Sequence, residues 1–251
     1  MDEKNLTLAD LDAYNIPEHV AIILDGNGRW AQRRGIERTQ GHVAGAENIY
    51  KIVQTAEEAG IKYLTGYAFS TENWNRPVKE VRFLMELIFK LFTKYLPEIR
   101  KSNIKVRVMG DRSGIPKNVL AVIKKVEDIT KDHTGMQAIL AFNYGGRREI
   151  VQATQQIAQA VQAGELSVED IDEDIFASYI YLPDVPDADL IIRPSGERRI
   201  SNFLLWRGAY AEFWGADVLW PDFSESDLVQ AIIDFNERDR RFGGLNDTDK
   251  Q

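Results

Sequence analysis

The sequence contains no cysteine among its 251 residues. This absence excludes disulfide bonds, thiolate nucleophiles and metal centres with cysteine ligands. The sequence also lacks an apolar run near the roughly 20 residues that a membrane-spanning helix needs. Residues 1–15 are acidic and polar, whereas a signal peptide has a basic region followed by an apolar one. We therefore expect a cytoplasmic protein without a membrane span.

Positive charge is in deficit. The chain has 31 Lys and Arg residues against 39 Asp and Glu residues, which gives a net charge of -8. A surface of this charge does not favour nucleic acid as a partner. The net negative charge does not exclude a local basic pocket for a small anionic ligand. The hydrophobic content of 44% is ordinary for a globular protein, and the length suits one α/β domain or two small ones.

Short apolar runs alternate with amphipathic segments along the chain. The apolar runs predict strands, and the segments with helical periodicity predict helices. Strands are expected at 20–24, 61–69, 106–109, 137–142 and 190–192, with a sixth inside 203–219. Helices are expected at 42–59, 78–99, 116–131, 147–163, 169–179 and 224–240. Such alternation implies a central, mostly parallel six-stranded sheet flanked by helices.

Two details of the helices follow from single residues. Pro97 is expected to end or kink the second predicted helix, because proline lacks a backbone donor. Ser167 and Asp170 have the spacing of a capping box and are expected to open the helix at 169–179.

Polar loops follow four of the predicted strands, at 25–29, 70–73, 143–147 and 193–197. Each loop has an arginine in it or shortly after it. In open parallel sheets, ligands bind beyond the carboxyl ends of the strands. We therefore expect these loops to line one site on the rim of the sheet.

The first loop reads DGNGRW, from Asp25 to Trp30. Gly26, Gly28 and Ala31 match a dinucleotide-binding fingerprint, so an NAD-binding oxidoreductase is one alternative. An aspartate directly before the first glycine would repel a pyrophosphate unless a cation intervened. The other alternative is a Mg²⁺–diphosphate ligand. The start of a helix near Gly28 and the Arg29 side chain would hold the anion, and Mg²⁺ would bridge it to Asp25.

A second candidate anion site lies in IIRPSGERRISNF, at residues 191–203. Arginines 193, 198 and 199 and the hydroxyl groups of Ser195 and Ser201 are ligands that suit phosphate. Two diphosphate sites on one rim predict a transferase that joins two diphosphate substrates.

Longer motifs carry a family resemblance. The segments HVAIILDGNGRWA, YAFSTENWNRP, FNYGGRREI, IIRPSGERRISNFLLW, AYAEFW and RRFGG together resemble the cis-prenyltransferases, and in particular the bacterial undecaprenyl diphosphate synthases. The resemblance runs from His19 to Gly244. It implies a single catalytic domain at 19–244, an N-terminal segment at 1–18 and a polar tail at 245–251.

The resemblance implies an activity. An allylic diphosphate, expected to be farnesyl diphosphate, would be extended by repeated condensation with isopentenyl diphosphate, each added double bond being cis. The product would be a long polyprenyl diphosphate such as undecaprenyl diphosphate, the precursor of the carrier lipid for cell-wall glycans. The resemblance also implies Mg²⁺ as cofactor, a homodimer and transient membrane association through the lipid product. A shorter-chain synthase and a non-catalytic partner subunit are the alternatives within the family.

The resemblance assigns roles to single residues. Asp25 would be the catalytic acid and a Mg²⁺ ligand, Glu212 a further Mg²⁺ ligand, and Asn73 a second catalytic residue. Because a neutral amide is a very weak base, we expect Asn73 to orient its neighbours, and Asp25 or a diphosphate oxygen to take the proton. The allylic diphosphate would be held by Gly26, Asn27, Gly28, Arg29, Trp30, Arg38 and His42.

Further residues are assigned to substrate loops. A mobile loop would contain Ser70, Thr71, Glu72, Trp74 and Arg76. Isopentenyl diphosphate would be held by Arg193, Arg199, Ile200 and Ser201, and Arg241 and Gly243 would reach the site of a neighbouring subunit. The predicted helix at 78–99, with Ala68 and Met136, could line a tunnel for the growing chain.

Overall fold

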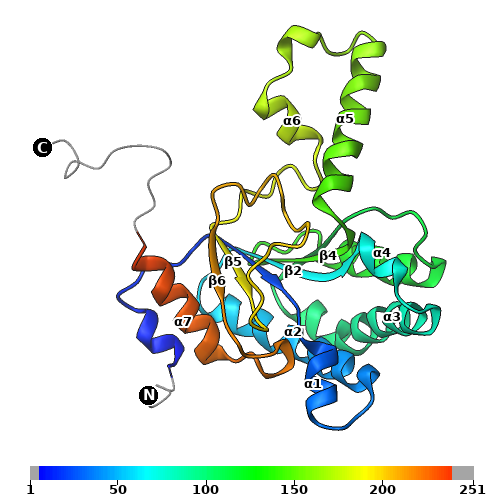
Figure 1. Ribbon diagram of the computed structural model, residues 1–251. Coiled ribbons are helices and arrows are strands. Elements are labelled where there is room, and N and C mark those ends of the chain that lie inside the picture. Colours follow the sequence, from blue (N-terminus) through cyan, green and yellow to red (C-terminus); the bar gives the residue numbers. More distant parts are fainter. Residues whose placement is uncertain (1–5, 239–251) are drawn as a thin grey trace, which may run out of the picture.

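The computed structural model describes residues 6–238. These residues form one α/β domain around a six-stranded sheet with the strand order β3-β4-β2-β1-β5-β6 (Figure 1). Every neighbouring pair of strands is parallel. The strands are β1 His19–Ile23, β2 Tyr63–Ser70, β3 Lys105–Met109, β4 Gln137–Tyr144, β5 Leu190–Arg193 and β6 Glu212–Gly215. The predicted six-stranded sheet is confirmed, and it is entirely parallel.

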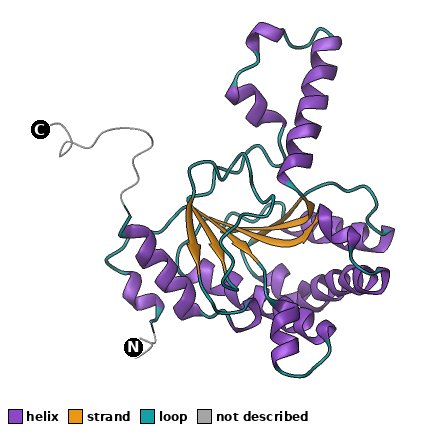
Figure 2. Ribbon diagram, viewed as in Figure 1, coloured by secondary structure: helices purple, strands orange, loops and turns teal. Residues whose placement is uncertain are grey.

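Most of the helices pack against one face of the sheet (Figure 2). The α-helices are α1 Asn27–Arg33, α2 Arg38–Glu58, α3 Val78–Lys101, α4 Lys117–Thr130, α5 Gly146–Gln162, α6 Glu173–Tyr179 and α7 Glu225–Asn236. Short 3-10 helices are η1 Leu8–Leu11, η2 Thr71–Asn75, η3 Val168–Asp170 and η4 Trp220–Asp222. None of the helices within residues 6–238 is long and apolar enough to cross a membrane.

Two helix predictions need correction. The helix expected at 169–179 is split into η3 and α6, because Asp172 caps α6 by accepting a hydrogen bond from the Ile175 backbone N–H at 2.8 Å. The Ser167 side chain makes no cap bond to η3. Pro97 does not end α3, which continues to Lys101. Its ring removes one backbone donor, and the apolar residues on either side, Leu96 and Ile99, keep this turn packed on the core.

One face of the sheet is covered by helices. Val20 and Ile22 of β1 belong to an apolar cluster with side chains of α2 and α7. Val108 of the edge strand β3 and Leu140 of its neighbour β4 pack on the same face with α3 and α4. Because β1 lies in the middle of the sheet, all five of its residues are buried. This explains why its sequence is a continuous apolar run without alternation.

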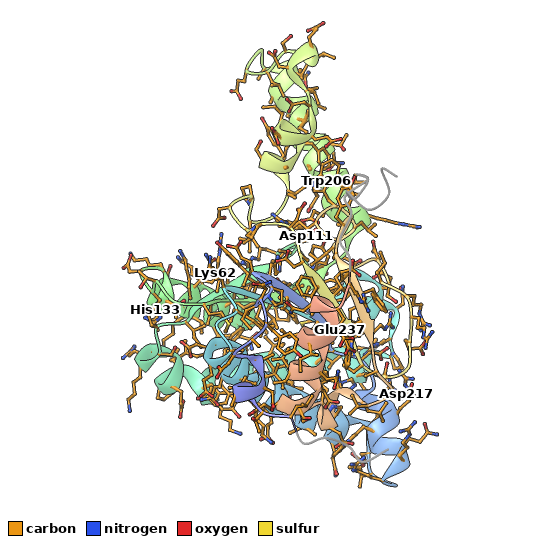
Figure 3. All side chains as sticks on the ribbon, turned by 90° about the vertical axis from the view of Figure 1, so that its left-hand side faces the viewer. Lys62, Asp111, His133, Trp206, Asp217 and Glu237 are labelled. Carbon is orange, nitrogen blue, oxygen red and sulfur yellow. The ribbon has the colours of Figure 1, made fainter. Side chains whose placement is uncertain are left out.

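The opposite face is covered mainly by a segment without helices. Side chains from 181–204 pack on the strand residues Ala21, Tyr67 and Ile139. Pro183 and Pro186 interrupt any helix in this segment. Helices α5 and α6 instead project from the body (Figure 1). Trp206 lies where the projection meets the body (Figure 3), and its ring contacts that of Phe176 in α6 at 4.3 Å between centroids.

Candidate active site

The turn between β1 and α1 brings Asp25 to the rim of the sheet. Gly26 adopts φ +103° and directly precedes α1. A Cβ at Gly26 would lie 2.9 Å from the Leu219 Cδ2 atom, and a Cβ at Gly28 would lie 2.3 Å from the Arg38 Nη1 atom. Gly26 therefore needs glycine for its backbone conformation and for space, whereas a side chain at Gly28 would displace the Arg38 guanidinium. The helix predicted to begin near Gly28 is confirmed as α1.

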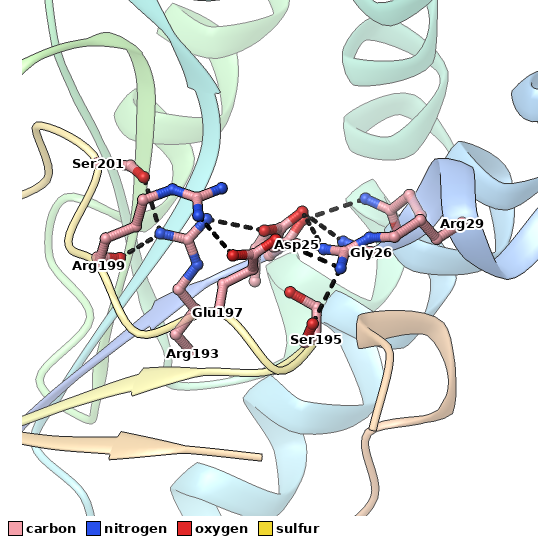
Figure 4. Close-up of polar contacts among 10 residues, drawn as sticks. Asp25, Gly26, Arg29, Arg193, Ser195, Glu197, Arg199 and Ser201 are labelled. Carbon is pink, nitrogen blue, oxygen red and sulfur yellow. Dashed lines mark hydrogen bonds and ion pairs between the residues drawn. The ribbon is translucent and has the colours of Figure 1, made fainter. Parts of the chain in front are cut away.

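Asp25 forms ion pairs with arginines from two elements (Figure 4). Its Oδ2 atom accepts a hydrogen bond from Arg193 Nη2 at 2.8 Å, and its Oδ1 atom lies 3.3 Å from Arg29 Nη2. The Gly26 N–H also donates to Asp25 Oδ1 at 2.6 Å. Partial burial opposes ionisation, but the Arg193 hydrogen bond and the charges of both arginines outweigh it and lower the pKa of Asp25. Asp25 is therefore a carboxylate at neutral pH.

Arg193 reaches Asp25 because β5 lies next to β1 in the sheet. Its guanidinium donates to the Arg199 carbonyl oxygen and, at 2.7 Å, to the Ser201 hydroxyl group (Figure 4). Only 4% of the Arg193 side chain is exposed. A buried and fixed arginine of this kind holds the segment 199–201 beside Asp25.

Glu80 is a residue that the sequence analysis missed. Its Oε1 atom lies 3.2 Å from Arg38 Nε, 3.0 Å from Arg76 Nη1 and 3.3 Å from His42 Nε2. One carboxylate thus joins two of the predicted ligands of the allylic diphosphate, Arg38 and His42, to Arg76 of the predicted mobile loop. Acidic residues are common in the first turn of a helix, because they interact favourably with the helix dipole. Nothing in the sequence therefore distinguished Glu80 from an ordinary residue of this kind.

His42 is nearly buried beside Glu80. Burial lowers the pKa of His42, although the Glu80 carboxylate opposes this shift. The imidazole is therefore neutral at pH 7, and it can offer one N–H donor to an anion.

Glu197 holds a third group of arginines. Its Oε1 atom lies 3.5 Å from Arg29 Nη1, and its Oε2 atom accepts from Arg199 Nη1 (Figure 4). Arg29 also donates to the Ser195 carbonyl oxygen at 2.9 Å. The loop after β5 and the first turn of α1 are joined by these contacts.

These groups surround a cavity of about 340 Å³. Its described lining contains five arginines, at positions 29, 38, 76, 193 and 199, and Asp25 as the one carboxylate. Gly26, Asn27, Gly28, His42, Ser70, Asn73 and Ser201 complete its polar lining. The excess of positive charge suits a ligand with several negative charges. Three of the four predicted polar loops therefore meet at one site.

The fourth loop, at 143–147, lies elsewhere. Asn143 and Arg148 line a separate polar recess with Thr71, Trp74 and Asp111. The Trp74 indole N–H donates to Asn143 Oδ1 at 2.7 Å. Thr71, Glu72 and Trp74, although in the predicted substrate loop, are not among the residues that line the arginine cavity. The reason is that η2 exposes opposite sides to the two hollows.

Other predicted residues also lie outside the cavity lining. The Trp30 indole donates to Asp222 Oδ1 at 2.7 Å, which directs it to η4. Ile200 is 39% exposed at the surface. Arg241 and Gly243 lie outside the described residues.

Glu212 lies at the amino ends of the strands, whereas Asp25 lies beyond their carboxyl ends. It begins β6 and pairs in register with Leu190, whereas Asp25 contacts Arg193 at the far end of β5. Its Oε2 atom accepts from Arg238 Nη1 at 2.7 Å. No group of three or more His, Asp or Glu side chains is placed to hold a metal within residues 6–238. A single copy of the chain does not bring Glu212 and Asp25 together.

Asn73 uses its side-chain oxygen inside its own turn. Asn73 Oδ1 accepts from the Ser70 backbone N–H at 3.1 Å, which closes a capping box at the start of η2. Asn73 also lines the arginine cavity, to which it contributes an amide group. Such a group can donate a hydrogen bond, and it has little capacity to accept a proton.

Apolar hollows adjoin the arginine cavity. A narrow one of about 40 Å³ shares Leu24, Asn27, His42, Ala68 and Leu84 with it. This neck in turn shares Leu24, Ile49 and Trp220 with an apolar cavity of about 140 Å³ between the sheet and helices α2 and α3. Ala68 and α3 thus line the hollows as predicted, whereas Met136 is buried in the core and outside these described linings. The polar cavity and the two apolar hollows are therefore neighbours that share lining residues.

The comparisons with known proteins agree with this geometry. The sequence family described as "Putative undecaprenyl diphosphate synthase" matches residues 23–243. Isoprenyl transferases from Clostridium perfringens and Thermotoga maritima are each 50% identical to the chain over 230 residues, which is 92% of it and 91% and 98% of theirs.

Solved structures are similar as well. Lavandulyl diphosphate synthase from Lavandula x intermedia, in complex with dimethylallyl diphosphate, is 39% identical, with a TM-score of 0.88 over 90% of this chain and 98% of that one. A "probable undecaprenyl diphosphate synthase" from Campylobacter jejuni is 31% identical, with a TM-score of 0.76 over 91% of this chain and 99% of that one. From its sequence match, its fold and its site, the chain belongs to the undecaprenyl diphosphate synthase family of cis-prenyltransferases.

Proposed function

We propose that this protein is a cis-prenyltransferase that extends an allylic diphosphate by repeated condensation with isopentenyl diphosphate. The observation that carries the proposal is that the five-arginine cavity adjoins apolar hollows with which it shares lining residues. A diphosphate with a hydrocarbon tail has the same division into a charged and an apolar part. The family match and the dimethylallyl diphosphate bound by a structural relative support this substrate class. Both favour chain elongation over the dinucleotide-binding alternative.

The residues divide into two anion sites. Arg29, Arg38 and Arg76 surround the start of α1 and would hold the allylic diphosphate. Arg193, Arg199 and Ser201 follow β5 and would hold isopentenyl diphosphate. When the allylic C–O bond breaks, negative charge grows on the leaving diphosphate. Fixed guanidinium groups stabilise this charge at little cost in reorganisation, because Glu80 and Glu197 already orient them.

The proton that leaves after carbon–carbon bond formation needs an acceptor. Asn73 Oδ1 accepts from the Ser70 N–H, and a neutral amide is a very weak base. We assign Asn73 a role in orienting substrate. The acceptor is then a diphosphate oxygen or the Asp25 carboxylate, which is ionised at neutral pH.

We further propose Mg²⁺ as the cofactor. Mg²⁺ is commonly bound through one or two carboxylates together with substrate phosphates. Asp25 fits as one such ligand, because it is ionised and its side chain is 30% exposed at the cavity. When bound, the ion would neutralise diphosphate charge. Glu212 does not fit beside Asp25 in one chain, and it would have to come from a second copy, in keeping with the predicted homodimer.

The length of the product and its destination are also proposals. The relatives named for isoprenyl transfer and undecaprenyl diphosphate synthesis support a long product that serves cell-wall glycans. A shorter product is the alternative. A long polyprenyl chain would associate transiently with a membrane, and the predicted cytoplasmic location is compatible with that route.

The test is turnover. Purified protein would be incubated with farnesyl diphosphate, labelled isopentenyl diphosphate and Mg²⁺, and the products would be sized. We expect a ladder of long products that disappears with chelator and in the Asp25→Asn variant. A single short product would establish the shorter-chain alternative. No incorporation with farnesyl, geranyl or geranylgeranyl diphosphate, in the presence of detergent, would refute the proposed activity.

A further inference from the structure

Asn202 joins three segments that are distant in the sequence. Its backbone oxygen accepts from the Gly146 N–H at 2.7 Å, and its side-chain Oδ1 accepts from the Arg147 N–H at 2.8 Å. Its side-chain Nδ2 donates to Glu72 Oε1 at 2.7 Å. One residue thus connects the loop after β5, the start of α5 and the 3-10 helix η2.

The backbone at this point is held in an unusual conformation. Ser201 and Asn202 have φ angles of 48° and 64°. Such angles are uncommon for residues other than glycine, and asparagine tolerates them better than most. Conformations of this kind persist where surrounding contacts fix them. The strain is adjacent to Ser201, whose hydroxyl group binds the buried Arg193.

The packing around the Asn202 amide is tight. A Cβ on Gly145 would lie 2.5 Å from the Thr71 Oγ1 atom and 2.8 Å from the Asn202 Nδ2 atom. Only a glycine lets η2 and the loop after β5 meet above the end of β4. The close approach leaves the Asn202 amide in one orientation, with its oxygen towards Arg147 and its nitrogen towards Glu72.

Glu72 is charged when it accepts this hydrogen bond. Partial burial would raise the pKa of Glu72, but hydrogen bonds from its own backbone and from Asn202, Ser70 and Thr71 lower it overall. A hydrogen bond to a carboxylate is stronger than one between neutral groups. Glu72 lies in η2 between Ser70 and Asn73, both of which line the arginine cavity.

We propose that Asn202 is a positioning residue that couples the two diphosphate sites. Through Glu72 it holds η2, and with it Ser70 and Asn73, at the cavity. Through its backbone it fixes Ser201 and hence the Arg193–Arg199 side of the same cavity. Asn202 itself is not among the residues that line the arginine cavity. The kinetic part of this inference rests on the proposed function, whereas the contact itself does not.

Asn202→Asp tests the contact at constant shape. A carboxylate still accepts from the Arg147 N–H, but it cannot donate to Glu72 and places a like charge against it. In the double variant Glu72→Gln/Asn202→Asp, the new amide at position 72 supplies a donor. It restores the hydrogen bond with donor and acceptor exchanged. Asn103→Asp is the matched control, because the Asn103 amide bridges the Thr134 backbone and side chain in a distant, exposed turn.

Hydrogen exchange of the substrate-free protein gives the first readout. We expect a peptide spanning residues 70–77 to exchange faster in Asn202→Asp than in the wild type. It should return towards the wild-type rate in the double variant and stay unchanged in Asn103→Asp. Unchanged exchange in Asn202→Asp, or no recovery in the double variant, would overturn the proposal whether or not the protein turns over.

Steady-state kinetics give the second readout. We expect Asn202→Asp to lower kcat/KM for isopentenyl diphosphate by about tenfold, the usual scale for a hydrogen bond to a charged group. The KM values for both diphosphates should rise. The double variant should recover to the level of Glu72→Gln alone. If the wild type incorporates isopentenyl diphosphate and the double variant is no better than Asn202→Asp, the coupling role is wrong. A wild type without incorporation would contradict the proposed function and leave the exchange result to decide the contact.

Discussion

Two carboxylate–arginine pairs in this molecule have similar chemistry and different surroundings. Asp25 and Arg193 are 2.8 Å apart, and the Asp25 side chain is 30% exposed at the cavity. Glu149 and Arg207 are 3.5 Å apart, and their side chains are only 1% and 2% exposed. The first pair opens onto a ligand site and the second is enclosed in the core.

The surroundings give the two carboxylates opposite pKa shifts. Burial raises the pKa of Glu149, and the Tyr144 hydroxyl group and the Arg207 charge only partly oppose this shift. Two arginines lower the pKa of Asp25. Arg207 is further fixed by the carbonyl oxygens of Leu182 and Val185. An enclosed pair therefore holds segments together, whereas a pair at a cavity keeps a charge available for a ligand.

Removing Arg207 should have the largest effect on stability. In Arg207→Met, Glu149 loses its counter-charge and two backbone carbonyls lose their donor inside the core. Breaking a buried pair in this way costs about 3–5 kcal/mol of the free energy of unfolding, measured by urea denaturation at pH 7. The loss should shrink as the pH falls, because protonated Glu149 no longer needs a counter-charge. A loss below about 1 kcal/mol would mean that the enclosed pair contributes no more than an exposed one.

Removing the Asp25 charge should mainly affect turnover. Asp25→Asn keeps an oxygen that can accept from Arg193 but loses the charge at the cavity. We expect kcat to fall by about 10²–10³-fold, the scale for removing one preorganised group from a transition state. The melting temperature at neutral pH should fall only modestly, because the amide oxygen still accepts from Arg193. The control is Asp128→Asn, a carboxylate far from the site that should retain full activity.

The pH dependence of stability should distinguish the two carboxylates. A lowered pKa in the folded state contributes stability above the unfolded pKa, and this contribution is lost as the pH falls through the folded value. The wild type should therefore lose stability relative to Asp25→Asn on acidification below about pH 4, where an ordinary Asp carboxyl takes up its proton. For Glu149, with its raised pKa, stability is instead lost as the pH rises. Denaturation curves collected from pH 3 to 7 would show both trends, and a constant difference between wild type and Asp25→Asn would contradict the first.

An exposed pair should give the smallest effect. Lys124 and Asp128 are 3.0 Å apart on α4, with side chains 76% and 59% exposed. Asp128→Asn should lower the free energy of unfolding by about 0.5 kcal/mol or less, since water screens such pairs. Urea denaturation in low and high salt would measure it. If the free energy of unfolding fell as much as in Arg207→Met, burial would not explain the different contributions of the two ion pairs.

Much of this arrangement could be predicted from the sequence. The apolar run before Asp25 predicts a buried strand. The loops after residues 24, 69 and 192 are predicted to meet, as they do, because parallel strands have their carboxyl ends on the same side of the sheet. Glu80 could not be predicted, since its role arises only when α3 lies beside the start of α2. The split of the helix at 169–179 was missed because the competing cap at Asp172 is local side-chain geometry.

The sequence by itself determined the class of the protein and the residue types at the site. Periodicity gives strands and helices, and long ordered motifs give the family. Only the tertiary structure decided which charges face each other, that Glu212 and Asp25 lie at opposite ends of the strands, and that the loop at 143–147 borders a different hollow. The physical reason is that the distances between side chains on different strands depend on the order of the strands and on the face of the sheet that each connection crosses. Neither is encoded in the spacing of residues along the chain.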